Sequence, residues 1–444
     1  MLLGFSCKNF KTYREETIFS MSPNFRHRDL LDSILTITHG KKILKGLSTS
    51  VIYGPNASGK TNLIAAMDFF RCVVLSGNVQ NIQNFGSSNF AITNPHLIPN
   101  WNANDEPVEF RIEFVDGSLL VEYALAISMG TFLLGNTNKR RAVHKEELKI
   151  FGKSVFSRTE TNIEIHVEPI QKYLIEPSQK KVLLAIAQKN LQSSDLFLTN
   201  SFRHLFSSKI SDLIVNWFRK SFRTLIGAHQ VQTFPNAVAK GALLVPDDDF
   251  QNAIKEFGIH QNKIGFVADE KLPIPLKVTI YPSTEKENIP LPAELIESLG
   301  TLRFLDIFPI LLDAFATGQT LVLDEFDASL HPMALKNIVN AFHNNEVNIN
   351  QAQLIFNTHN PFFLDSKYFR RDEIKFVDRD EETGNSELYQ LSDFPENGGH
   401  GARKTNSYVK NYFVHRYGAI HEVDFTPFLK KAALTGKENR DETN

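Results

Sequence analysis

Apolar and polar residues follow two different periods along the chain, and each period predicts a different kind of element. From residue 107 the period is two. Apolar side chains alternate with mostly polar ones on both sides of the Asp116-Gly117 turn, at Val108, Phe110, Ile112, Phe114, Val121, Tyr123, Leu125 and Ile127. This alternation predicts an antiparallel hairpin with one face in solvent. Further short strands are expected at 147–151 and 162–167, which extend the hairpin into a meander.

Two other stretches combine the helical period with short apolar runs, which is typical of an α/β fold. Near the N-terminus, strands at 1–10 and 50–53 precede a helix that starts at Asn62. Towards the C-terminus the pattern predicts a helix at 298–315, a strand at 320–323, a helix at 332–343 and a strand at 353–358. Residues from about 168 to 260 are expected to be helical, with an apolar stripe from Ile210 to Leu225.

The strongest candidate for chemistry follows the strand at 50–53. The residues Gly54-Pro55-Asn56-Ala57-Ser58-Gly59-Lys60-Thr61 satisfy the pattern G-x-x-x-x-G-K-[ST]. Glycines let the backbone curl so that consecutive N–H groups point at phosphate oxygens, and the next helix presents its positive end to them. Lys60 supplies a charge for the β- and γ-phosphates, and the Thr61 hydroxyl can bind Mg²⁺. The sequence therefore predicts an ATP site on this P-loop.

Two further strands end in polar residues that can serve the same nucleotide. Asp324 and Glu325 follow the strand at 320–323, at the edge where α/β sheets bind ligands. Asp324 is expected to hold Mg²⁺, directly or through water, and Glu325 to polarise the attacking water as general base. His359 follows the strand at 353–358, where it could reach the γ-phosphate or that water. The alternative for a lone histidine is a structural role.

A fourth candidate is Glu297-Ser298-Leu299-Gly300-Thr301, just ahead of a predicted helix. The simpler interpretation is that Ser298 is the N-cap of that helix. The functional interpretation is that the Ser298 hydroxyl, the Gly300 backbone and the helix dipole form a second anion site. Such a site cannot serve the P-loop of its own protomer, and it would close over the ATP of a partner subunit.

In this order the motifs resemble those of the ABC-type ATPases of the SMC, RecF and OLD group. Within that group the chain is similar to AAA-labelled ATPases found beside bacterial abortive-infection and phage-defence genes (AbiL/RloA type, with the PARIS and Septu ATPases as relatives). The resemblance extends to Lys8–Tyr13, Asp324–Pro332, Arg370–Val377 and Arg416–Ile420. It implies that Lys11 and Thr12 contact the nucleotide and that Asp327 senses the opposite subunit. The predicted nucleotide contacts are therefore Lys11, Thr12, Gly54–Thr61, Asn62, Ser298, Gly300 and Asp327.

The resemblance implies an α/β fold, a P-loop NTPase of ABC/SMC-head type with an inserted antiparallel β-meander plus helical lobe. The head is expected in two parts, residues 1–130 with the P-loop and 276–380 with the signature, the acid pair and the histidine. Residues 131–275 would form the inserted lobe, for dimerisation or partner contact. Residues 381–444 would form a C-terminal extension that is disordered from Gly436.

The expected activity is Mg²⁺-dependent ATP hydrolysis, with ATP and Mg²⁺ as cofactors and a homodimer or higher homo-oligomer bridged by ATP between the heads. By resemblance the chain is a regulatory or sensor subunit of an abortive-infection system. It would control a separately encoded effector, a Toprim-like nuclease or another toxin, in response to a phage protein or nucleic acid. The alternative is a RecF- or SMC-like DNA-repair ATPase with nucleotide-gated DNA binding.

The composition of the chain excludes several other classes of protein. The 444 residues include 48 Lys and Arg and 50 Asp and Glu, and the net charge of −2 excludes a constitutive nucleic-acid coating role. Two cysteines cannot form a disulfide framework or a four-thiolate zinc site. No uncharged apolar run reaches the roughly 18 residues of a membrane-spanning helix. A cytoplasmic protein without membrane contact is therefore expected.

One acidic cluster lies outside the predicted ATP site. Asp378, Asp380, Glu381 and Glu382 precede Thr383-Gly384-Asn385, which indicates a solvated turn and not a metal site. A metal nuclease needs several carboxylates or histidines converging on its ions. Nuclease chemistry is therefore expected on the effector and not on this chain.

Overall fold

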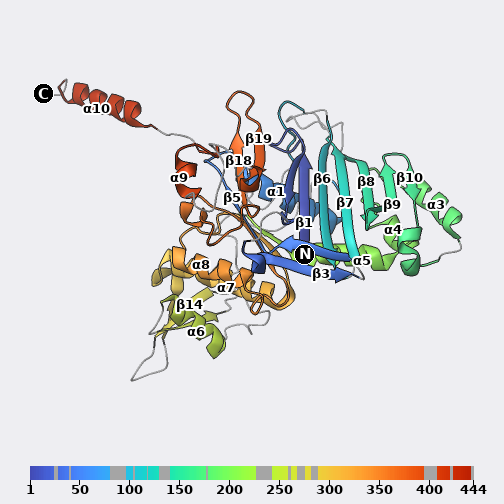
Figure 1. Ribbon diagram of the computed structural model, residues 1–444, viewed down its shortest axis with the longest axis horizontal. Coiled ribbons are helices and arrows are strands. Elements are labelled where there is room, and N and C mark those ends of the chain that lie inside the picture. Colours follow the sequence, from blue (N-terminus) through green and yellow to red (C-terminus); the bar gives the residue numbers. More distant parts are fainter. Residues whose placement is uncertain are drawn as a thin grey trace.

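The computed structural model describes residues 1–24, 29–39, 42–80, 97–103, 106–117, 119–129, 141–176, 179–226, 243–258, 262–267, 276–281, 289–394, 408–420 and 424–441. An antiparallel sheet lies beside a parallel sheet, a smaller lobe lies below them, and helix α10 (Thr426–Asp441) projects away from the body (Figure 1). Among the described helices, none combines the length and the apolar character needed to span a bilayer.

The antiparallel sheet has the strand order β10-β9-β8-β7-β6-β1-β2. Its strands are β1 (Leu2–Lys8), β2 (Thr17–Ser20), β6 (Val108–Asp116), β7 (Leu119–Ser128), β8 (Ala142–Ile150), β9 (Lys153–Thr159) and β10 (Ile163–Ile165). Val108, Phe110, Ile112 and Phe114 are buried while Glu109 is exposed, so the predicted alternation is confirmed. The pattern did not indicate β9, whose core-facing Val155 and Phe156 are adjacent and interrupt a strict period of two.

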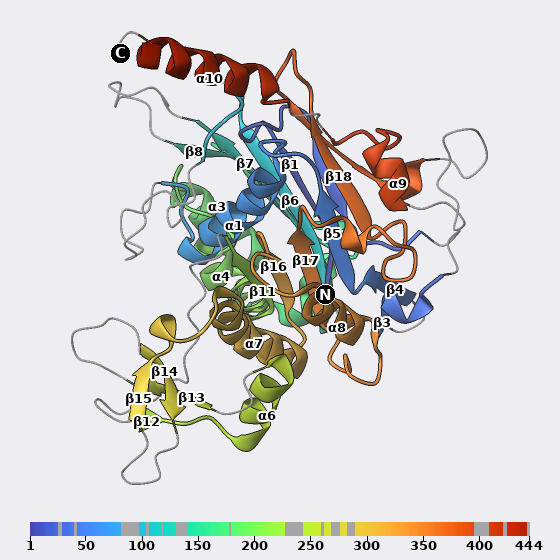
Figure 2. The ribbon, with the colours of Figure 1, turned by 90° about the vertical axis from the view of Figure 1, so that its left-hand side faces the viewer.

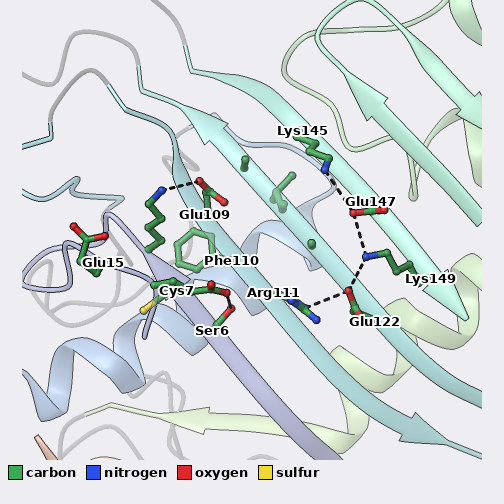
Figure 3. Close-up of a pocket in the computed structure, with 15 residues that line it drawn as sticks. Ser6, Cys7, Glu15, Glu109, Phe110, Arg111, Glu122, Lys145, Glu147 and Lys149 are labelled. Carbon is green, nitrogen blue, oxygen red and sulfur yellow. Dashed lines mark hydrogen bonds and ion pairs between the residues drawn. The ribbon is translucent and has the colours of Figure 1, made fainter. Parts of the chain in front are cut away.

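The outer face of this sheet carries a polar pocket of about 350 Å³ (Figure 3). Charged side chains line it and pair across neighbouring strands. The Glu122 carboxylate forms ion pairs with Arg111 at 3.2 Å and with Lys149 at 3.1 Å. Lys8 forms an ion pair with Glu109 at 3.7 Å. Because cations and carboxylates neutralise each other here, the pocket favours neither anions nor cations. None of the described residues that line it is a predicted site residue.

The second sheet has the order β11-β16-β17-β5-β18-β19 and is parallel except for its last strand. Its strands are β5 (Thr49–Tyr53), β11 (Phe222–Leu225), β16 (Thr320–Leu323), β17 (Gln353–Asn357), β18 (Ile374–Arg379) and β19 (Ser386–Gln390). Every residue of β5, β16 and β17 is buried. Parallel strands are covered by structure on both faces, which explains their unbroken apolar runs.

Two hydrophobic cores lie on the two faces of the parallel sheet. Ile52 of β5 belongs to the core shared by α1 (Lys60–Ser76) and the antiparallel sheet. Its neighbours Val51 and Tyr53 belong to the core that contains residues of α7 (Leu299–Thr317) and α8 (Pro332–His343). Figure 2 shows α1 on one side of the sheet and α7 with α8 below it. The helices predicted at 298–315 and 332–343 and the strand at 320–323 are confirmed.

The stripe from Ile210 to Leu225 is only partly helical. Helix α5 (Ser208–Asn216) ends in a π-helical turn at Trp217–Ser221, and β11 follows. The Arg71 side chain donates to the carbonyls of Phe218 and Phe222, at 3.0 and 2.8 Å. β11 then pairs in parallel with β16, and the Asp324 N–H donates to the Leu225 carbonyl at 2.9 Å. Tertiary pairing therefore overrides the helical period, and the helical prediction is wrong for these last four residues.

A small sheet of order β12-β13-β14-β15 forms the lower lobe with α6 (Asp248–Phe257). Its strands are β12 (Leu243–Leu244), β13 (Lys263–Val267), β14 (Leu276–Tyr281) and β15 (Ile289–Pro292). The Phe257 ring stacks on Phe304 of α7 at 4.1 Å between centroids, which fixes the lobe to that helix. The remaining elements are the hairpin β3 (Ile34–His39) and β4 (Lys42–Leu47), and helices α3 (Lys180–Lys189), α4 (Ser201–Leu205) and α9 (Tyr408–Phe413).

The predicted domain boundaries do not follow the sheets. Residue 130 falls between β7 and β8, which pair along their length, and β11 of the expected insert lies in the parallel sheet. The division of the chain into a two-part head, an inserted lobe and a C-terminal extension stays a prediction. Helix α10 runs through Gly436, where a disordered tail is predicted. A single glycine costs a helix only about 1 kcal/mol, and nothing after Pro427 breaks it.

Candidate nucleotide-binding site

The P-loop residues Gly54–Thr61 join β5 to α1 at the C-terminal edge of the parallel sheet. Gly59 is the N-cap of α1, with φ of +117°, a conformation that favours glycine. A Cβ at this position would also strike the hydroxyls of Ser386 and Thr12. The Gly59 N-cap has no side chain, so no side-chain cap competes with a phosphate at the start of α1.

Lys60, the first residue of α1, is buried and turned onto its own loop. Its ammonium donates to the carbonyls of Gly54 and Pro55, both at 2.8 Å. Burial lowers the pKa of Lys60 to about 8, and the nearby Asp324 and Glu325 carboxylates oppose that shift. An ammonium held by two neutral carbonyls can exchange them for phosphate oxygens, which are stronger partners.

Thr61 and Asp324, the two predicted metal ligands, lie side by side. The Thr61 hydroxyl donates to the Asp324 carboxylate at 3.0 Å, across 263 residues of sequence. Hydroxyl and carboxylate oxygens are the donors that Mg²⁺ prefers, and Mg²⁺ is commonly held by one or two carboxylates together with substrate phosphates. Across the described residues, no group of three or more His, Cys, Asp or Glu side chains is arranged to hold a metal without a substrate. The donor set fits a metal bound with a nucleotide.

Asn357 was not predicted, and it holds both acids in place. Its amide nitrogen donates to the Asp324 carboxylate, and its amide oxygen accepts the Glu325 N–H at 2.6 Å. The register of the sheet explains this position, because Leu323 pairs with Phe356 and the next residue on each strand is Asp324 or Asn357. Glu325 has φ of +51°, an uncommon conformation for a residue other than glycine. Its side chain lies exposed at the sheet edge.

His359 and Asp327 lie at the same edge. The Thr358 hydroxyl donates to the Asp327 carboxylate at 2.5 Å, which joins the turn after β17 to the turn after β16. Burial lowers the pKa of His359, Lys60 lowers it further, and Asp327 and Glu325 oppose the shift. The imidazole is therefore neutral at pH 7. The structure brings the predicted residues Lys60, Glu325, Asp327 and His359 within electrostatic reach of one another.

The turn after β1 lies against the P-loop. The Thr12 hydroxyl accepts from the Asn62 amide at 3.1 Å, and the Tyr13 hydroxyl donates to the Gly59 carbonyl at 3.0 Å. Partial burial lowers the pKa of Lys11. The predicted residues Thr12 and Asn62 are therefore beside the P-loop, whereas the Lys11 ammonium lies 5.4 Å from the centre of the Phe10 ring, and within the described residues no hydrogen bond or ion pair joins it to the P-loop.

Ser298 and Gly300 lie elsewhere, at the start of α7. The Ser298 hydroxyl accepts the Thr301 N–H at 3.2 Å, so the N-cap role is confirmed. Within the described residues, no hydrogen bond joins Ser298 or Gly300 to the P-loop of their own chain. The second anion site thus remains a prediction about a partner subunit.

Two other P-loop contacts were missed because they come from a distant hairpin. β18 and β19 carry Arg379 and Ser386, which donate to the carbonyls of Ala57 at 3.4 Å and Ser58 at 2.5 Å. The only signal in the sequence is the block from Arg370 to Val377, which the resemblance includes without assigning these contacts. These two hydrogen bonds hold the Ala57 and Ser58 carbonyls of the loop in place.

Comparison with known proteins gives one family match. The family described as AAA domain, putative AbiEii toxin, Type IV TA system matches residues 50–365. That span includes the P-loop, Ser298, the acid pair and His359. No curated protein matches.

Solved structures of SMC head domains are similar at low identity. An SMC head bound to the C-winged helix domain of ScpA has 14% identity and a TM-score of 0.39, and covers 88% of this chain and 97% of its own. The SMC head domain from Thermotoga maritima has 14% identity and a TM-score of 0.36, with 88% and 98% covered. An Smc head with an extended coiled coil bound to the C-terminal domain of ScpA, from Pyrococcus furiosus, has 12% identity and a TM-score of 0.36, with 88% and 96% covered. The predicted fold class, an α/β P-loop head with an antiparallel meander, is confirmed.

Proposed function

The chain belongs to the AAA-domain family described as putative AbiEii toxin of type IV TA systems, and we propose that it is the ATP-hydrolysing regulatory subunit of an anti-phage system. It is a P-loop ATPase of the ABC/SMC-like class. The finer proposal is an abortive-infection ATPase of AbiL/RloA type that controls a separately encoded effector. The observation that carries the ATPase is the 3.0 Å hydrogen bond from Thr61 to Asp324, which unites the P-loop with the acid pair.

The chain's own residues divide the hydrolysis of ATP among them. The N–H groups at the start of α1 and the Lys60 ammonium bind the phosphates. Thr61 and Asp324 would hold Mg²⁺, which supplies charge stabilisation for the transferred phosphoryl group. Glu325 accepts a proton from the attacking water, and neutral His359 orients that water or the γ-phosphate by a hydrogen bond.

A homodimer bridged by ATP is the assembly we propose. The start of α7 is exposed and apolar, with Leu295 at 80% and Leu299 at 72% exposure on either side of Ser298. Exposed apolar residues that lie together on a surface favour a protein contact there. In the proposed dimer the Lys60 of one protomer faces Ser298 of the partner subunit across the nucleotide.

The effector is proposed to be a separate protein, a Toprim-like nuclease by resemblance. The acidic cluster of this chain serves a turn between β18 and β19. The Asp380 carboxylate accepts from the Thr383 N–H and hydroxyl, both at 2.7 Å, and the Asp378 carboxylate accepts from the Ala419 N–H at 3.0 Å. These carboxylates are engaged in local structure, which supports a division of labour between ATPase and effector.

The division of labour can be tested in cells and with purified protein. The chain is expressed alone and together with the gene beside it, and growth is followed with and without phage. We expect growth arrest only with both genes, and its loss in Lys60→Ala and Glu325→Gln. Lys430→Ala, which removes an exposed lysine of α10, is the matched control and should keep the arrest. Cleavage of DNA or tRNA by the purified chain alone, lost on changing Asp378 or Asp380, would contradict the proposal.

A further inference from the structure

The start of α7 is seated on the turn that follows β16 in the same chain. A Cβ on Gly300 would lie 2.6 Å from the Ser329 carbonyl oxygen, so this close approach needs a glycine. One turn further along the helix, the Arg303 guanidinium donates to the Glu325 carbonyl at 3.4 Å. Arg303 is only 7% exposed. The helix that carries Ser298 therefore contacts the backbone of the proposed general base within one protomer.

Two more charges continue this contact into the small sheet. Asp306 lies one turn after Arg303 on α7, and its carboxylate forms an ion pair with the Lys277 ammonium of β14. Burial raises the pKa of Asp306, and Lys277 and Arg303 both oppose that shift, so the carboxylate interacts with the two cations. Lys277 is 8% exposed. Breaking a buried charge pair is costly, so a displacement of β14 would also move Asp306, which lies one turn from Arg303 on the same helix.

Glu325 is the element of the site that such a displacement can change. Its backbone has the left-handed φ of +51° and is held at the N–H by Asn357 and at the carbonyl by Arg303. A residue kept in an uncommon conformation by its surroundings is sensitive to the loss of one of them. The direction of the Glu325 side chain therefore depends on both contacts.

We propose that Arg303 is a positioning residue for Glu325, and that the small sheet β12–β15 regulates ATP turnover through Lys277, Asp306 and Arg303. The inference rests on the proposed function, because it assigns a regulation to the same ATPase site. A displacement of the small sheet would change the rate of hydrolysis without any contact with the nucleotide.

The test compares Arg303, a residue of α7, with Arg223, which contacts the same helix from β11. Arg303→Met removes the contact with Glu325, and Arg303→Lys keeps a cation there. Arg223→Met is the matched control, because Arg223 of β11 lies 3.8 Å from Asp313 near the other end of α7. The full chain is measured for ATP affinity, kcat, KM and melting temperature.

We expect Arg303→Met to lower kcat roughly tenfold at unchanged ATP affinity, as for other residues that orient a catalytic group. Arg303→Lys should recover most of kcat, and Arg223→Met should keep it. Equal kcat in Arg303→Met and Arg223→Met would overturn the inference, as would parallel losses of affinity and melting temperature in both Arg303 variants. A wild-type chain that neither binds nor hydrolyses ATP would instead contradict the proposed function.

A second pair of variants tests the regulation by the small sheet. Lys277→Met and Asp306→Asn remove the two outer charges and leave Arg303 in place. We expect an intermediate loss of kcat, about threefold, again without a change in ATP affinity. A wild-type kcat in both, beside a reduced one in Arg303→Met, would overturn the part of the proposal that concerns the small sheet.

Discussion

The starts of α1 and α7 are both helix N-termini at predicted phosphate sites, yet their surroundings differ. The start of α1 is enclosed by its own chain, with Thr12, Tyr13 and Ser386 around Gly59. The start of α7 is exposed, and Leu295 and Leu299 beside it lie in solvent.

The two helices also differ in how their N-termini are capped. Gly59 leaves the first N–H groups of α1 without a side-chain acceptor, whereas the Ser298 hydroxyl already accepts the Thr301 N–H at 3.2 Å. A phosphate can bind at α1 without displacing a side chain, but at α7 it competes with the cap. One half of the proposed site is therefore complete within a protomer, and the other half is the one that we propose a partner subunit completes.

The largest effect on ATP binding and turnover is expected at the enclosed half of the site, the P-loop at the start of α1. Lys60→Ala should abolish measurable ATP binding, because a buried cation that faces the phosphates is removed. Glu325→Gln should keep binding and lose turnover by roughly 100-fold or more, as expected for loss of a general base. Binding titrations and phosphate release separate the two variants. Equal residual turnover in both would contradict the assigned roles.

Asn357 should give the next effect, because it orients Asp324 and Glu325 from the neighbouring strand. Asn357→Ala is expected to lower kcat about 10- to 100-fold, in the range seen when a group that orients a metal ligand is removed. Asn345→Ala, an exposed position after α8, is the control. The comparison is measured as phosphate release over a range of Mg²⁺ concentrations. An unchanged Mg²⁺ dependence and kcat would show that Asp324 needs no such support.

The next effect is expected on ATP-dependent association, at the exposed start of α7. Leu299→Glu should prevent ATP-dependent association while ATP still binds to each protomer, because a charge would be buried at the proposed interface. Leu429→Glu, on the exposed α10, should associate as the wild type does. Sedimentation with and without ATP measures the change, in a Glu325→Gln background that prevents turnover. Association that survives Leu299→Glu would place the interface on another surface.

The smallest effect is expected from pH. The lowered pKa of His359 lies below the ordinary 6.5, so the ring is neutral at pH 7 and gains a proton only in more acidic solution. Turnover should be flat around pH 7 and fall by up to roughly tenfold as the pH drops below that pKa. His359→Gln should remove this fall. A rate that rises on acidification would show that the protonated ring is the active form.

The enclosed half was largely predictable from sequence, and the contacts around it were not. β5, β16 and β17 are apolar runs that end in Gly54, Asp324 and Asn357, and parallel strands bring such ends to one edge. Lys60, Thr61 and the acid pair could be predicted because an ammonium, a hydroxyl and two carboxylates are the groups that bind phosphate and Mg²⁺. Asn357 was missed because an amide at a strand end has no reaction of its own.

Other features depend on pairing between distant segments. Ser386 and Arg303 act through contacts with Ser58 and Glu325 that no local pattern contains. The strand at Phe222–Leu225 was missed because a segment of four residues with apolar ends fits a helix or a buried strand equally well, and only pairing with β16 decides between them.

The pairing of β11 with β16 has a consequence for any attempt to delete residues 131–275 or to move them to another protein. β11 covers the outer edge of β16, so a deletion of residues 131–275 would leave one side of Thr320–Leu323 without its backbone partners. An uncovered central strand is a template for joining the sheet of another molecule, and aggregation is the expected result. The insert therefore cannot be exchanged freely between proteins, because any recipient must offer a strand that pairs with β11.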